Sequence, residues 1–84
     1  MARFYLHLHN RTGLVPDEEG TELPDLDAAR QIAVDAIRDL ISEEARSGLI
    51  DLRGYIEIAE ESGKAAVRIA FSSAVDLHLG EASS

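Results

Sequence analysis

One segment with both ends marked, residues 25–48, most constrains how this chain can fold. Asp25 can accept hydrogen bonds from the first free N–H groups of a helix, and Pro24 disfavours an earlier start. Gly48 can adopt the left-handed conformation that commonly follows a helix C-terminus. The interior contains no Gly or Pro and is rich in Ala, Leu, Arg and Glu, which favour helix formation. The segment therefore predicts a single long helix.

The apolar side chains of this helix cover roughly 220° of its circumference, well beyond the ~100° stripe that a surface helix needs. Either a small sheet curls around the helix, or a second copy of the chain covers one flank. The alternatives concern Ile32 with Ala36 on one flank and Val34 with Ile41 on the other. Full burial of an aliphatic side chain is worth roughly 1.5–3 kcal/mol, so exposing either pair is a real loss for a small domain.

Length and composition bound the class of protein. The 84 residues suffice for one domain, expected over residues 1–79, with a disordered tail at residues 80–84. The 16 acidic and 8 basic side chains give a formal charge of −8 without a cluster of cations, so no nucleic acid partner is expected. The chain has no cysteine, which excludes disulfides and thiolate chemistry. With no secretory h-region and no apolar stretch of membrane-spanning length, a cytoplasmic location without membrane contact is expected.

Alternating apolar and polar residues predict strands on both sides of the helix. Residues 4–9 form the first strand, residues 10–13 a turn, and residues 14–15 a return strand. After the helix, residues 54–59 and 65–71 predict a second pair. The connector at residues 49–52 carries Leu49, Ile50 and Leu52, which we expect to reach the core.

The alternation of apolar and polar residues in the second pair of strands sets their register. Ile58 must face the same way as Val67, which places Glu57 opposite Arg68 on the outer face. The predicted fold is α+β with the order β-β-α-β-β, in which one long helix packs on one face of an antiparallel or mixed sheet of about four strands. The expected inward-facing residues are Phe4, Leu6, Leu8, Val15, Ala33, Ile37, Leu40, Ile56, Ile58, Val67, Ile69 and Phe71.

Two histidines on the first strand are candidate metal ligands. His7 and His9 are two residues apart and so project from the same face, close enough to share a divalent cation. A third ligand would have to come from His78 or a carboxylate, because protein metal sites normally use three or four. The alternative is a solvated or partner-facing pair.

Six carboxylates and no cation lie in residues 17–27, before and within the helix start. The spacing is not that of an EF-hand, which alternates oxygen ligands over twelve positions. The charge favours the helix N-terminus, where the dipole is positive. A basic protein partner is the functional alternative for this segment.

No arrangement typical of an enzyme is present. The serines lack a nucleophile-elbow context, and Asp25 stands where a phosphate would bind at the helix N-terminus. We therefore expect no catalysis and no cofactor. Tyr5, Tyr55 and Arg68 on the outer sheet face suit protein recognition, although an ordinary wet face is the alternative.

Three stretches carry a resemblance to known proteins: the opening R-F-Y-L-H-L, the segment D-E-E-G-T-E-L-P-D-L-D-A-A-R at residues 17–30, and I-E-I-A-E-E-S-G-K. Together they resemble a family of short bacterial proteins of unknown function, over residues 3–77. That resemblance implies no assigned activity. A weaker likeness is to HicB-type antitoxins, in which a strand hairpin leads through an acidic turn into one helix; the proline-aspartate-leucine of that family falls here at Pro24-Asp25-Leu26.

The expected function is a small non-enzymatic interaction module that forms a homodimer through the helix flank or a sheet edge. The alternatives are an antitoxin-like or regulatory partner that uses residues 17–27 against a basic protein, and a metal-binding module. The candidate contact residues are Tyr5, Tyr55, Arg68, Ile32, Val34 and Ile41.

Overall fold

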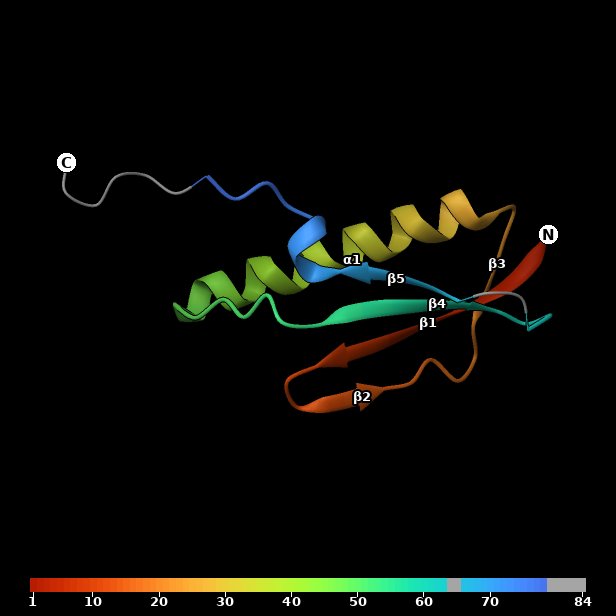
Figure 1. Ribbon diagram of the computed structural model, residues 1–84, viewed down its shortest axis with the longest axis horizontal. Helices are drawn as coiled ribbons and strands as arrows, with labels where there is room; N and C mark the ends of the chain where they lie inside the picture. Colours follow the sequence, from red (N-terminus) through yellow and green to blue (C-terminus); the bar gives the residue numbers. More distant parts are fainter. Residues whose placement is uncertain (64–65, 79–84) are drawn as a thin grey trace.

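The computed structural model describes residues 1–63 and 66–78, which form a layer of antiparallel strands with one helix on its inner face (Figure 1). The predicted tail at residues 80–84 lies outside the described residues. In chain order the elements are β1 (Ala2–Asn10), β2 (Gly13–Val15), β3 (Thr21–Leu23), α1 (Leu26–Ser47), β4 (Tyr55–Glu60), β5 (Val67–Ala70) and a 3₁₀ turn η1 (Phe71–Ser73).

The predicted α+β class is confirmed. The sheet order is β2-β1-β4-β5, and all pairings found in the described part of the chain are antiparallel. The structure adds β3, a strand that the sequence did not indicate. It pairs with the N-terminal end of β1, on the same edge where β2 pairs with the C-terminal end.

Both predicted helix ends are confirmed. The Asp25 side chain accepts a hydrogen bond from the Ala28 N–H at 2.9 Å, and α1 begins at the next residue after this cap. At the other end Gly48 has a φ of 89°, and its N–H donates to the Ala45 carbonyl. Local chemistry at the two termini is therefore sufficient to define this helix.

The strand register also follows the sequence pattern. Ile58 pairs with Val67 and Glu57 with Arg68, as the alternation required. The core lies between the sheet and the helix, whose buried contributions include two alanines that allow close approach of the two layers. Its buried members are Phe4, Ala29, Ala33, Ile37, Ile56, Ile58, Ile69, Phe71 and Ala74.

The expectation for the connector after α1 is wrong in part. Leu52 packs against the core, but Leu49 and Ile50 are 55% and 47% exposed. Val15, expected to face inward, pairs with Leu8 yet remains 54% exposed because α1 does not extend over β2.

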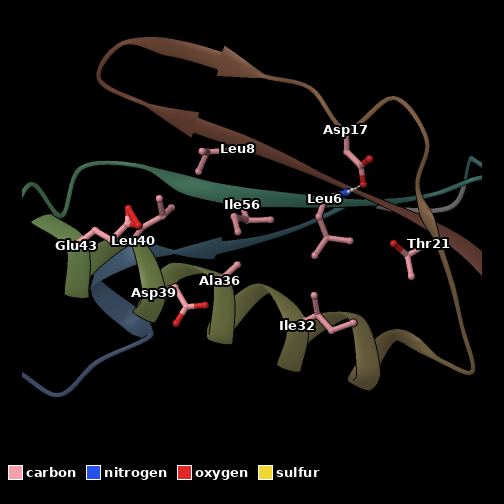
Figure 2. A pocket seen from close by; sticks show the side chains of 10 residues that line it. All are labelled: Leu6, Leu8, Asp17, Thr21, Ile32, Ala36, Asp39, Leu40, Glu43 and Ile56. Atoms are coloured by element: carbon pink, nitrogen blue, oxygen red, sulfur yellow. Dashed lines mark hydrogen bonds between the residues drawn. The ribbon is translucent and has the colours of Figure 1, made fainter.

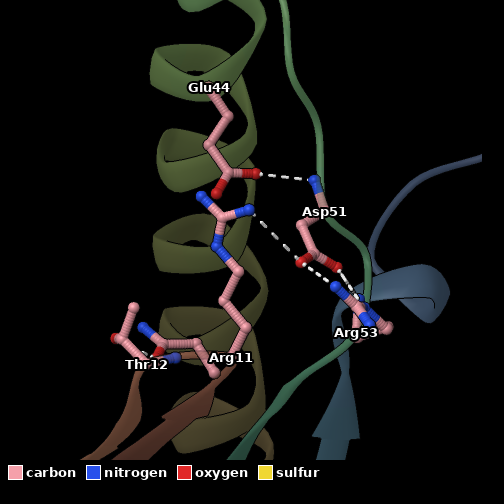
Figure 3. A network of polar contacts seen from close by, with 6 residues as sticks. Arg11, Thr12, Glu44, Asp51 and Arg53 are labelled. Carbon is pink, nitrogen blue, oxygen red and sulfur yellow. Dashed lines mark hydrogen bonds and ion pairs between the residues drawn. The ribbon is translucent and has the colours of Figure 1, made fainter.

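A polar cluster around Asp51 anchors the connector (Figure 3). The Asp51 carboxylate accepts from Nε and Nη2 of Arg53 at 3.0 and 2.9 Å and lies 3.7 Å from Nη1 of Arg11 in the β1–β2 turn. The Asp51 N–H donates to Oε1 of Glu44 on α1. The hydrogen bonds from the side chain and backbone of Arg53, with the charge of Arg11, hold the pKa of the Asp51 carboxyl at about 2. The cluster therefore ties hairpin, helix and connector together.

Candidate functional site

The sheet is wider than the helix that covers it. α1 packs over β4 and also contacts β1, β3 and β5, while β2 lies away from the helix (Figure 1). A cavity of about 450 Å³, here called the open groove, lies between α1 and the inner face of β1. The described residues, 1–63 and 66–78, thus leave part of the apolar layer without cover.

Apolar side chains of the sheet form the floor of the open groove, and apolar side chains of α1 form the wall that faces it (Figure 2). Leu6 and Leu8 of β1 and Ile56 of β4 point from the sheet toward the helix. The facing wall comes from one flank of α1, and its Ile32 is 41% exposed. The helix side chains on this wall are Ile32, Ala36 and Leu40.

The edge of the groove is acidic. Asp39 and Glu43 lie four residues apart on α1 and therefore on the same side of the helix, next to the apolar wall. Asp17 borders the groove from the opposite side, in the loop between β2 and β3. None of the described residues that line the groove is Lys or Arg. An apolar floor with three carboxylates at its edge favours a ligand that is both apolar and cationic.

Asp17 also organises the backbone at this edge. Because β2 and β3 pair with opposite ends of β1, the Leu6 N–H faces the loop between them, and the Asp17 carboxylate accepts from it at 3.1 Å. The same carboxylate accepts from the Gly20 N–H at 3.0 Å. Burial alone would raise the pKa of Asp17, but these amide hydrogen bonds outweigh it and lower the pKa below its usual value.

The two strand histidines share the outer sheet face but have separate partners. Nδ1 of His7 accepts from the Asp17 N–H at 3.1 Å, so a neutral His7 carries its proton on Nε2. His9 stacks on Tyr55 with ring centroids 4.4 Å apart, and its Nε2 lies 3.6 Å from Glu57. Within residues 1–63 and 66–78, no group of three or more His, Cys, Asp or Glu side chains is placed to hold a metal ion, and His78 is exposed. Metal binding stays a prediction without a third ligand.

The predicted recognition residues on the outer face form two separate stacks. Tyr5 lies parallel to His7 at 6.3 Å between ring centroids. Arg68 lies over the Tyr55 ring with its guanidinium carbon 4.7 Å from the centroid. These contacts hold the aromatic side chains against the sheet, which is a sufficient structural role for them.

The other predicted flank of the helix is closed. Val34 and Ile41 are half-buried against the core. Next to them Arg38 donates from Nε to the Ala74 carbonyl at 2.8 Å, which holds the segment after η1 against this flank. This flank therefore offers less free apolar surface than Ile32 and its neighbours.

Sequence reasoning identified Ile32 and Ala36 but missed the acidic edge. Asp39 and Glu43 interrupt the apolar arc on one side only, and their four-residue spacing was a signal that this flank borders solvent. The role of Asp17 could not be found in this way, because it depends on a backbone N–H that two short strands leave unpaired.

Comparison with known proteins adds a family without an assigned activity. The domain of unknown function DUF6894 matches residues 3–72, which is most of the chain. No curated protein and no solved structure matches the chain, and the likeness to HicB-type antitoxins is not shown. Among the described residues, the one long helix is too polar to cross a membrane. The predicted resemblance to a family of uncharacterised proteins is confirmed: the chain belongs to the DUF6894 family.

Proposed function

We propose that this protein is a small cytoplasmic interaction module that binds a protein partner in the open groove. The observation that carries the proposal is the unfilled apolar space between Ile32 on α1 and Leu6 on β1. Apolar side chains around a cavity of this size lose stabilising contacts unless another surface fills it. A partner that covers this flank would supply them.

The charge at the groove argues against self-association through the same flank. Two copies meeting there would bring Asp17, Asp39 and Glu43 of each chain together, without a lining cation to compensate. A homodimer through the β2 edge is the second candidate, because Leu14 and Val15 on that edge strand are both more than half exposed. The antitoxin-like alternative is a special case of the proposal, since Asp17 belongs to the acidic segment and also borders the groove.

Site-specific photo-crosslinking tests the proposal. A crosslinking amino acid at position 36 faces the groove, whereas the same group at the exposed position 30, about 120° around the helix from Ala36, lies away from it and serves as the control. We expect protein adducts in the source cells from position 36 only, and their loss when Ile32→Asp is added. Equal adducts at both positions, or none at position 36, would contradict the proposal. Adducts with a second copy of the chain would favour the homodimer, which light scattering would then have to show.

A further inference from the structure

The width of the sheet indicates what kind of element fills the open groove. Strands lie about 4.8 Å apart and a helix with its side chains is about 10 Å wide, so one helix covers about two strands. The sheet is four strands across, with β2 and β3 sharing one edge position. α1 packs over β4 and also contacts β1, β3 and β5, whereas the groove beside it opens over Leu6 and Leu8 of β1, toward β2. The free space is therefore as wide as a second helix lying next to α1.

We infer that the open groove binds a basic amphipathic helix from a partner protein, laid beside α1 on the sheet. This inference rests on the proposed function and adds the chemistry of the partner. Along α1 the groove extends from Ile32 to Glu43, a rise of about 16 Å or three helical turns. A partner segment of about 12–15 residues spans that length, with apolar side chains at helical spacing against Leu6, Leu8 and Ile56.

The carboxylates at the groove determine the sign of the charge that the partner must carry. Asp39 and Glu43 lie along one side of the groove and Asp17 on the other, so Lys or Arg on both flanks of the bound helix would face carboxylates. The formal charge of −8 on the whole chain adds a long-range attraction for the same partner. A second copy of this chain does not supply such a free basic helix, because its own α1 already covers its core.

A pair of designed peptides tests this inference with the full-length chain. The first peptide has about 15 residues, with leucines at helical spacing and lysines on both flanks. The second replaces every lysine by glutamate and keeps the leucines. Binding is measured by titration calorimetry, and methyl NMR of the isoleucines locates the site. We expect the lysine peptide to bind with shifts at Ile32 and Ile56, which line the groove, and at least about tenfold more tightly than the glutamate peptide.

Two charge-matched variants of the protein separate local from overall charge. Asp39→Asn with Glu43→Gln removes two carboxylates at the groove, and Asp76→Asn with Glu61→Gln removes two exposed carboxylates elsewhere. We expect the first pair to weaken the lysine peptide about five- to tenfold and the second pair to change it less than about twofold. Circular dichroism melts verify that both variants fold.

The outcomes distinguish this inference from the proposed function. Equal binding of both peptides at the groove would overturn the charge selection and leave the groove as an interaction site. Failure of both peptides, together with protein adducts at position 36, would overturn the helical partner but not the interaction module. Equal losses in both variant pairs would show that net charge, not the groove, attracts the peptide, and would overturn the inference.

Discussion

Both flanks of α1 carry apolar side chains in the sequence, yet the fold covers only one of them. On the closed flank Val34 and Ile41 pack against the core, and Arg38 holds the segment after η1 beside them. On the open flank Ile32 and Ala36 face a cavity whose far side is formed by Leu6 and Leu8 of β1, which are only partly buried. Of the residues that the structure describes, those after β5 continue over one side of the helix, and none covers the other side.

This difference shows that an apolar arc by itself does not say what covers it. The closed flank is completed by residues that follow β5, more than 30 positions later in the sequence. The open flank faces strands that the same helix is too narrow to cover. A functional surface can therefore arise where a sheet is one strand pair wider than its helix layer.

Ile37 lies between the flanks and gives the scale for complete burial. It is fully buried, so Ile37→Ala leaves a cavity and should lower the free energy of unfolding by about 3 kcal/mol or more. Ile32→Ala on the open flank removes the same atoms and should cost less than about 1 kcal/mol, because the side chain is already 41% exposed. Urea denaturation measures both. Equal losses would mean that the open flank is as closely packed as the centre of the helix.

A substitution at Gly54 tests how tightly the core is packed around Phe71 of η1. A Cβ at Gly54 would approach the His9 carbonyl oxygen to 2.6 Å and the Phe71 ring to 2.7 Å, so Gly54→Ala should displace η1 and destabilise the protein by about 2–3 kcal/mol. Gly13→Ala is the matched control, because Gly13 also has a positive φ, 126° against 146°, but no atom near its Cβ position. We expect only the strain cost of about 1 kcal/mol there. Similar losses in the two variants would show that Phe71 yields freely.

Asp17 tests the far border of the open groove. Asp17→Ala removes the acceptor of the Leu6 and Gly20 N–H groups and should cost about 1–2 kcal/mol at neutral pH. Because its pKa in the folded protein lies below the usual value of 3.8, the carboxylate stabilises the fold above that pH and loses this effect as the pH falls through the lowered pKa. The variant should therefore lose less stability than the parent chain on acidification from pH 6 to about pH 3. If the variant and the parent chain lost the same free energy of unfolding over this pH range, the stabilising role of the Asp17 carboxylate would be contradicted.

The sequence predicts those parts of the fold that depend on neighbouring residues. Asp25 and Gly48 define the helix because capping acts over one turn, and the register of β4 and β5 follows from alternation. The short strand β3 was missed because Thr21–Leu23 lies among carboxylates and is a strand only through its pairing with Ala2–Phe4. Its existence depends on a contact about 20 residues away, which local propensity does not encode.

The candidate site was predictable only in half. The sequence identifies Ile32 and Ala36 as one of two helix flanks that need cover, since their positions on a helix follow from the 100° spacing. Which flank stays open depends on where α1 lies across the sheet and on the path after β5. Neither is a property of the helix itself. The groove floor from Leu6 and Leu8 was predicted as ordinary core, because alternation shows which side of a strand is apolar but not what lies above it.

The smallest expected effect is the sharpest test of the open flank. Ile32→Ser should change the free energy of unfolding by less than about 1 kcal/mol, because much of the side chain already contacts water. Val34→Ser on the closed flank should cost about 1.5–2 kcal/mol, since it places a hydroxyl against the core. Denaturant unfolding at several protein concentrations measures both.

The concentration series carries the decisive information in that comparison. If the chain is monomeric and the groove is empty, the small effect of Ile32→Ser is the same at every concentration. If a second copy fills the groove, the parent chain gains stability with concentration and the variant does not, because only the associated state buries Ile32. The loss would then grow past that of Val34→Ser at high concentration, and the preference for a basic partner over a second copy would be wrong.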